Sequence, residues 1–213
     1  MEEEDDLKGS EPVAGLPELP PEGERILWQG APNWWALASD ALMVRWVAAY
    51  FLLLAVWRGW AGWADGGVAQ GSGALMALLG AGFVTCGLLC LSAWIMARAT
   101  VYTITNRRVA MRIGAALTVT LNLPYRWIGS ADLQTKPNGT GTIALSLIGE
   151  TRFSYLVIWP HARPWRIANS QPALRCIPDA EKVARILGEH ARSAVTRGAG
   201  DAPLAAPETI AAE

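Results

Sequence analysis

The chain contains a long stretch without charge, because no Asp, Glu, Lys or Arg lies between Asp65 and Arg98. As one helix, the 32 intervening residues would extend about 48 Å. A bilayer core is only about 30 Å thick, so this stretch is longer than a membrane requires. Its glycine-rich start, residues 66–73, is better interpreted as a turn. The sequence therefore predicts a membrane-spanning helix over residues 74–97.

A second apolar stretch, residues 41–57, lies between Asp40 and Arg58. Tryptophan is unusually frequent, with 11 residues against 3 Phe and 4 Tyr. It flanks both ends of this stretch, at Trp34 and Trp35 on one side and at Trp57, Trp60 and Trp63 on the other. Tryptophan on both sides is typical of a helix that meets two membrane surfaces, whereas the alternative is a buried helix of a soluble core. We predict an interfacial segment over 25–40, a first spanning helix over 41–58 and a short external loop over 59–73.

Positive charges near the two spans predict their orientation. Arg25 and Arg45 lie on the N-terminal side, the intervening loop offers only Arg58, and four arginines follow the second span: Arg98, Arg107, Arg108 and Arg112. Because cytoplasmic flanks are enriched in Lys and Arg, both termini should be cytoplasmic. The expected location is the inner membrane, crossed more than once.

Small residues recur at every fourth position of the second span: Gly73, Ala77, Ala81 and Thr85. Such a face allows close approach of another helix. The partner could be the first span, a second copy of the chain in a homodimer, or a client protein.

After Arg98 the hydrophobic period changes from helical to two. Apolar residues alternate with polar ones over 109–113, 117–123 and 143–147, and less cleanly over 153–159. From Asp179, which is an N-cap candidate by residue type, one apolar helical face follows: Ala180, Val183, Ala184, Leu187, Ala191 and Ala194. We therefore expect a cytoplasmic α+β domain over 98–197, in which antiparallel strands are capped by a C-terminal helix.

Charge is segregated along the chain although the formal net charge is only −1. Residues 1–24 hold nine acidic residues against one lysine, and residues 98–197 hold fourteen Lys and Arg against five acidic residues. The acidic arm 1–24 and the tail 198–213 are predicted to be disordered. The basic domain, tethered at a membrane, is expected to contact anionic headgroups through Arg107, Arg108, Arg112, Arg163 and Arg166. A solvated basic face is the alternative, and nothing in the pattern favours nucleic acid.

Neither catalysis nor a metal site is indicated. The chain has two histidines and three cysteines, Cys86, Cys90 and Cys176, without a metal-ligand spacing or a nucleophile–base set. The glycine-rich segments lack the strand–loop–helix context and the lysine of a phosphate-binding loop. We expect no enzyme activity, no catalytic residues, no metal and no firmly bound cofactor.

Two segments, GERILWQGAPNWW (23–35) and TVYTITNRRVAMRIG (100–114), resemble bacterial pleckstrin-homology-like (PH-like) domains that carry a transmembrane hairpin. Five segments together resemble the PuhB family of photosynthetic reaction-centre assembly proteins of purple bacteria: GLPELPPEGERILWQGAPNWW (15–35), TNRRVAMRIGAALTVTLNLPY (105–125), GTGTIALSL (139–147), YLVIWPHARPW (155–165) and PALRCIPDA (172–180). The resemblance covers roughly residues 15–190. It implies a PH-like fold and a non-enzymatic role in assembling the reaction centre with its light-harvesting 1 complex. The partners would be subunits of those complexes and membrane lipids.

Two other functions remain open. One is a carrier that binds bacteriochlorophyll or lipid and delivers pigment to apoproteins; the other is a general PH-like membrane scaffold. Neither span contains a histidine, so a histidine-ligated pigment within the bilayer is excluded by the sequence. The only histidine near large aromatic rings is His161, between Trp159 and Trp165, which makes it a candidate contact for pigment or a partner.

Overall fold

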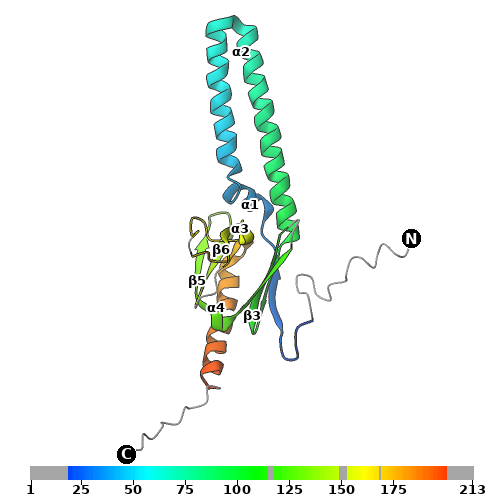
Figure 1. The fold of residues 1–213 in the computed structure, drawn as a ribbon, viewed down its shortest axis with the longest axis vertical. Helices are drawn as coiled ribbons and strands as arrows, with labels where there is room; N and C mark the ends of the chain where they lie inside the picture. The colour runs from blue at the N-terminus through cyan, green and yellow to red at the C-terminus, as the bar shows by residue number, and fades with distance from the viewer. Residues whose placement is uncertain (1–18, 115–117, 149–152, 168, 201–213) are drawn as a thin grey trace, which may run out of the picture.

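A computed structural model of the chain describes residues 19–114, 118–148, 153–167 and 169–200. Residues 1–18 of the acidic arm and 201–213 of the tail lie outside these residues, so the expectation that they are disordered is not addressed there. The expectation is wrong for the ends that are described, because Glu22, Gly23 and Glu24 bond to the domain and residues 198–200 belong to the C-terminal helix. The described chain has two parts: a domain of sheets and helices, and a long helical projection that leaves it at one end (Figure 1).

Seven strands form two antiparallel sheets. The first sheet has the order β1-β2-β3-β4 and the second has the order β5-β6-β7. The strands of the first sheet are β1 (Ile26–Gly30), β2 (Val101–Thr105), β3 (Arg108–Ile113) and β4 (Val119–Pro124). Those of the second are β5 (Ile128–Thr135), β6 (Thr140–Leu147) and β7 (Ala173–Pro178). A 3₁₀ turn, η1 (Tyr125–Trp127), joins the two sheets.

The C-terminal helix α4 (Ala180–Gly200) covers the core that the sheets enclose. Its residues Ala180, Val183 and Leu187 are buried in one cluster with Tyr102 and Ile143, as the apolar period predicted. The expected architecture of antiparallel strands and a C-terminal helix is therefore confirmed. One expectation is wrong: residues 153–159 do not form a strand, because Tyr155–Ile158 forms the short helix α3 instead.

Strand β1 precedes the helical projection in sequence but belongs to the domain. It pairs with β2 in antiparallel register from Ile26↔Thr105 to Gly30↔Tyr102. The segment 25–40 was expected to lie at the membrane interface as a lead-in, with the domain beginning at residue 98. That boundary is wrong, because the first strand of the sheet lies 70 residues upstream and the projection is an insertion between β1 and β2.

A short helix, α1 (Trp34–Asp40), connects β1 to the projection. Asn33 caps it, since its side-chain oxygen accepts a hydrogen bond from Ala36 N at 3.0 Å. The backbone N–H of Asn33 donates to the carbonyl of Cys176 in β7 at 2.8 Å, which attaches the start of α1 to the second sheet. Met43, with φ of 53°, then separates α1 from the next helix.

Helix α2 (Val44–Ala99) is the one helix in the described chain that is long and apolar enough to cross a membrane. Its backbone is not helical at Gly67, where φ is 78° and ψ is −177°. There the chain reverses, and two arms lie side by side (Figure 1). We name residues 44–66 the first arm and residues 68–99 the second arm. The expected loop over 59–73 is thus helical except at Gly67, so the arms are longer than the predicted spans.

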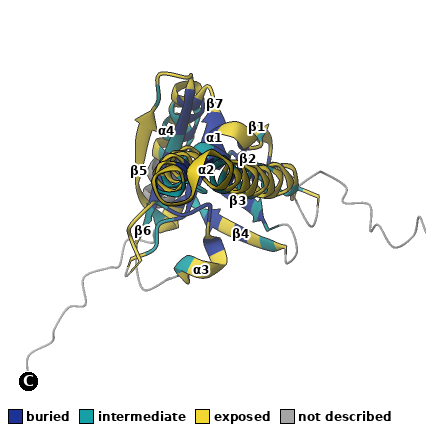
Figure 2. Cartoon of the chain, turned by 90° about the horizontal axis from the view of Figure 1, so that it is seen from above, coloured by how far each residue is buried: buried dark blue, intermediate teal, exposed yellow. Residues whose placement is uncertain are grey.

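Glycines allow the two arms to approach each other. A Cβ built on Gly62 would lie 2.9 Å from the Cα of Gly71, and one built on Gly82 would lie 2.7 Å from the Cβ of Phe51. Most other side chains of both arms are exposed, as Figure 2 shows in yellow along α2. An exposed apolar surface of this kind is typical of a surface that contacts a membrane or another protein.

Candidate membrane-interface site

The domain end of α2 carries polar and aromatic side chains on both arms. Arg45 and Trp46 begin the first arm, and the guanidinium of Arg98 lies 4.8 Å from the ring centroid of Trp94 at the end of the second. Trp34 and Trp35 of α1 are exposed at the same end and contact each other edge to face, with their ring centroids 5.7 Å apart. Tryptophan and arginine together are typical of the boundary between hydrocarbon and headgroups.

A second exposed apolar group lies in α3 and the loop after it. The side chains of Leu156 and Trp165 are 84% and 87% exposed, and Ile167 is exposed as well. This segment adjoins the base of α2, because His161, three residues after α3, contacts Thr100 at the end of α2. Figure 1 shows α3 at the end of the domain from which α2 leaves. Trp159 is less exposed, at 39%.

His161 lies inside the domain. Only 1% of its surface is exposed, Nδ1 lies 2.5 Å from the hydroxyl of Tyr102, and Nε2 lies 3.1 Å from the hydroxyl of Thr100. Burial, together with the positive charge of Arg175, lowers the pKa of His161 to about 3. With both ring nitrogens occupied, this imidazole offers no free ligand to a pigment. The flanking Trp159 and Trp165 remain accessible, but the histidine does not.

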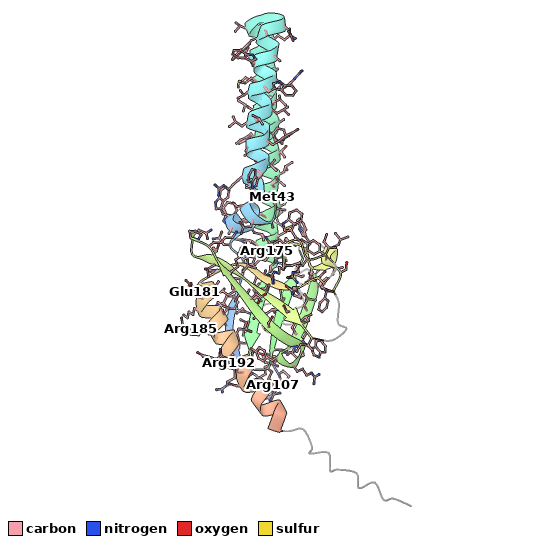
Figure 3. All side chains as sticks on the ribbon, turned by 90° about the vertical axis from the view of Figure 1, so that its left-hand side faces the viewer. Met43, Arg107, Arg175, Glu181, Arg185 and Arg192 are labelled. Carbon is pink, nitrogen blue, oxygen red and sulfur yellow. The ribbon has the colours of Figure 1, made fainter. Side chains whose placement is uncertain are left out.

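The candidate basic residues do not gather on one face. Arg107 lies in the turn between β2 and β3 and Arg108 is the first residue of β3, at the end of the domain opposite α2, where Figure 3 labels Arg107. Arg108 Nε donates to the buried carboxylate of Glu24 at 2.7 Å, and an Arg107 amino group donates to the carbonyl of Glu22 at 3.4 Å. If α2 crosses a membrane, these two arginines lie at the end of the domain away from it, so the predicted headgroup contact is not supported by their position.

The other three arginines are nearer the projection. Arg112 pairs in register with Val101, just after α2. Arg163 Nη1 donates to Asp132 Oδ2 at 2.6 Å, so its charge is compensated within the domain. Arg166 is exposed and follows Trp165 in the apolar loop.

The small-residue face of the second arm does not pack on the first arm. Gly73, Ala77 and Ala81 are exposed and Thr85 is half-buried, with its hydroxyl donating to the carbonyl of Ala81 at 2.8 Å. A Cβ built on Gly73, Gly80 or Gly87 would meet nothing within 4 Å. The contact with the first arm is instead made by other residues of the second arm, Gly71, Leu75 and Gly82. In the described structure Gly73, Ala77 and Ala81 are therefore not covered by the first arm.

Sequence reasoning missed an ion pair that joins α1 to the second sheet. Lys136, at the tip of the β5–β6 hairpin, pairs with the carboxylate of Asp40, the last residue of α1. The thiol of Cys176 donates to the same carboxylate at 3.5 Å. Burial and the neighbouring Asp40 charge raise the pKa of Cys176 to about 12, so the thiol stays protonated. No sequence pattern indicates a contact between Asp40 and Lys136, which are 96 residues apart. The contact depends on the position that the β5–β6 hairpin gives to Lys136.

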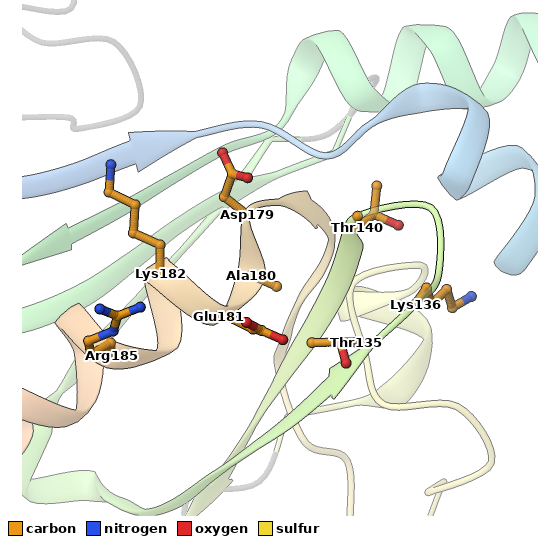
Figure 4. Close-up of a pocket in the computed structure, with 9 residues that line it drawn as sticks. Thr135, Lys136, Thr140, Asp179, Ala180, Glu181, Lys182 and Arg185 are labelled. Atoms are coloured by element: carbon orange, nitrogen blue, oxygen red, sulfur yellow. The ribbon is translucent and has the colours of Figure 1, made fainter.

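A hollow of about 490 Å³ lies at the start of α4, between β5, β6 and the helix (Figure 4). Its lining mixes the carboxylates of Asp179 and Glu181 with the cations of Lys136, Lys182 and Arg185. In Figure 4 Lys136 points away from the two cations of α4, so the positive charges do not converge. Within the described residues no three His, Cys, Asp or Glu side chains are grouped so as to hold a metal ion.

Comparisons with known proteins give the family. The family described as "Bacterial PH domain" matches residues 36–191. A protein of Rhodobacter capsulatus, named "Uncharacterized 23.7 kDa protein in puhA 5'region", is 47% identical over 205 residues, which cover 95% of this chain and 91% of the relative. A crystal structure of a pleckstrin-homology protein of the duf1696 family from Shewanella loihica aligns with 43% of this chain and 71% of its own, at 12% identity and a TM-score of 0.29, which is too low to support an argument. On the match to most of its length, the chain belongs to the bacterial PH domain family.

Proposed function

We propose that the chain is a non-enzymatic, membrane-anchored assembly factor for the photosynthetic reaction centre and its light-harvesting 1 complex, of the PuhB type. The observation that carries this proposal is the relative from the puhA 5′ region, puhA being a reaction-centre gene, which is 47% identical over nearly the whole chain. The sequence motifs that resemble PuhB lead to the same function independently.

In this proposal α2 crosses the membrane twice, as a hairpin that reverses at Gly67. The first arm of 23 residues is about 34 Å long and the second arm of 32 residues about 48 Å, so each is long enough for one crossing. Arg45 and Arg98 mark the boundary near the domain, and Trp57, Trp60 and Trp63 mark the other boundary. Both termini and the domain then lie on the cytoplasmic side of the inner membrane.

The second arm offers the surface for a subunit of the assembling complex. Gly73, Ala77 and Ala81 are exposed along the arm, and the first arm packs on other residues, Gly71, Leu75 and Gly82. In a bilayer, small residues allow a neighbouring helix to approach closely and gain van der Waals contact. A second copy of the chain is the other partner that fits this surface.

The experiment replaces Ala77 and Ala81 by Leu and measures co-purification with reaction-centre and light-harvesting 1 subunits after crosslinking. We expect loss of the partner subunits and reduced reaction-centre absorbance in the cells, with unchanged membrane insertion. Ala48→Leu and Ala64→Leu provide a matched control, because both alanines are exposed on the first arm. Normal assembly in the Ala77→Leu/Ala81→Leu variant would contradict the proposal that this surface binds a subunit.

Two further readouts address the function itself. Deletion of the gene should lower reaction-centre absorbance while other membrane complexes stay intact; a general loss of membrane complexes would favour a general scaffold instead. The absorption spectrum of the purified protein should show no stoichiometric pigment band, since such a band would favour a pigment carrier.

A further inference from the structure

The bend between α1 and α2 contains two adjoining hollows. One, of about 520 Å³, lies between α1 and the tip of the β5–β6 hairpin, and the other, of about 460 Å³, follows the first turns of α2. Ser39, Asp40 and Arg45 line both of them. We name these two adjoining hollows together the elbow site. Figure 3 marks its place at Met43, where α2 leaves the domain.

The polar half of the elbow site carries a net positive charge. Its lining holds the cations Arg45 and Lys136 and one carboxylate, Asp40. Because Lys136 forms an ion pair with Asp40, the charge of that carboxylate is compensated. Arg45 is exposed at the rim and supplies the excess positive charge.

A hydroxyl in the same place lacks a partner. The Oγ of Ser39 is buried from solvent and makes no hydrogen bond to another described residue. A buried hydroxyl without a hydrogen bond costs about 1–3 kcal/mol. Because Ser39 lines both hollows, rotation about its χ1 would turn the hydroxyl from this buried position toward the elbow site, where a ligand oxygen would accept its hydrogen bond. Ser39 and Arg45 thus offer one neutral and one charged donor to an anionic oxygen.

The other half of the elbow site is apolar. Trp46 and Ala49 of the first arm line it, and Trp46 is 72% exposed. Trp35 of α1 flanks the polar half. A ligand that fits this lining has an anionic head next to Arg45 and a hydrocarbon portion that runs along the first arm.

We propose that the elbow site binds one anionic phospholipid, with its phosphodiester at Ser39 and Arg45 and its acyl chains along Trp46 and Ala49. The proposal rests on the proposed membrane crossing, because the elbow site then lies at headgroup depth. The excess of one positive charge matches a lipid such as phosphatidylglycerol, which carries one negative charge, better than a zwitterionic lipid. Bound lipid would bridge α1, the hairpin tip and α2, and so fix the domain relative to the membrane helices.

The test uses the full chain purified in detergent, stripped of lipid and titrated with phosphatidylglycerol or phosphatidylcholine, with bound lipid counted by native mass spectrometry. We expect one tightly held phosphatidylglycerol, at least tenfold preferred over phosphatidylcholine. Arg45→Gln and Ser39→Ala should each weaken phosphatidylglycerol binding, the former by about tenfold, because a hydrogen bond to a charged group is lost.

Arg126→Gln is the matched control, since Arg126 is also exposed but follows β4 at the end of the domain away from α2. Equal retention of both lipids, or unchanged binding in Arg45→Gln, would overturn the proposal. Free inorganic phosphate at the same concentration should not compete, because it lacks the acyl chains; full competition would identify a simple anion site instead. Extraction of membranes with alkaline carbonate tests the membrane crossing separately, so failure of the lipid site is distinguishable from failure of the proposed anchoring.

Discussion

The hydroxyl of Tyr102 and the Nδ1 of His161 lie 2.5 Å apart in the interior of the domain and belong to a directional chain of hydrogen bonds. The hydroxyl of Thr100 donates to the carbonyl of Met96 at 2.8 Å, so its oxygen accepts from His161 Nε2–H. Nδ1 is then the acceptor, and Tyr102 donates to it. The backbone N–H of Arg175 in β7 donates to the Tyr102 oxygen at 3.4 Å, which completes the chain from the second sheet to the last turn of α2.

This chain requires a neutral His161 and predicts how stability depends on pH. The pKa of His161 is about 3 in the folded protein and about 6.5 when unfolded, so the unfolded state binds the extra proton in the interval between them. The free energy of unfolding therefore falls as the pH falls below about 6.5, by at most about 1.4 kcal/mol per pH unit for this group. Thermal unfolding in detergent between pH 7.5 and 5 measures this dependence of stability on pH. The interval lies above the range in which ordinary carboxylates titrate, so their contribution is small.

His190→Gln is the control for this measurement, because His190 is only partly buried on α4. His190→Gln should leave the slope of the free energy of unfolding against pH nearly unchanged between pH 7.5 and 5. His161→Gln should flatten this slope and lower stability at pH 7.5. An identical slope in the wild-type protein and His161→Gln would contradict the assignment of the neutral imidazole.

Two glycines of the second arm should respond in opposite directions to alanine. A Cβ on Gly82 would lie 2.7 Å from the Cβ of Phe51, so Gly82→Ala forces the arms apart and should cost about 1–3 kcal/mol. A Cβ on Gly80 would meet nothing within 4 Å, so Gly80→Ala should gain up to about 1 kcal/mol from helix propensity. Thermal unfolding in detergent measures both. Equal effects at the two positions would show that the arms do not pack as described.

Periodicity located the elements whose apolar faces are continuous. Strands β3, β4 and β6 and helix α4 each bury one regular face, so alternation or helical spacing was sufficient. Strand β5 was missed because most of its residues are exposed on the second sheet and it carries no apolar alternation. Strand β1 was missed because five residues before an apolar helix carry too short a pattern to indicate a strand.

The arrangement of the candidate site depends on contacts between residues that are far apart in the sequence, and no local sequence pattern predicts such contacts. The position of Arg107 and Arg108 follows from the direction of β2, which runs away from α2 and carries the next turn to the far end of the domain. The elbow site depends on the pairing of Asp40 with Lys136, and thus on the hairpin register of β5 and β6. Net charge of a segment indicated attraction to a membrane but not which arginines can reach it.

The buried pair of Glu24 and Arg108 should stabilise the attachment of β1. The Glu24 side chain is 2% exposed and that of Arg108 is 24% exposed. Burial alone would raise the pKa of Glu24, but the hydrogen bonds from Arg108 and Thr105 and the charges of Arg108 and Arg107 together outweigh burial and lower it. This stability is present above the ordinary pKa of a glutamate and is lost as the pH falls through the lower folded value.

Glu24→Gln should therefore destabilise the protein at pH 7 by about 1–3 kcal/mol, because Arg108 loses its charged acceptor. Asp132→Asn removes the acid of the exposed pair with Arg163 and should cost less than about 1 kcal/mol. Unfolding by urea in detergent compares the two variants. A larger loss in Asp132→Asn than in Glu24→Gln would contradict the difference in burial.

Because α2 is inserted between β1 and β2, a fragment without the membrane helices should fold only if it keeps the segments before and after α2. A fragment of residues 98–200 lacks β1, so the edge of β2 is unpaired and Arg108 has lost Glu24; we expect it to aggregate or remain unfolded. Joining residues 19–41 through a flexible Gly–Ser linker to residues 100–200 restores β1 and α1 without the apolar arms. This fusion should be soluble without detergent and unfold cooperatively in urea, as followed by circular dichroism. Equal solubility and cooperativity of the two fragments would show that β1 is dispensable, contrary to its place in the sheet.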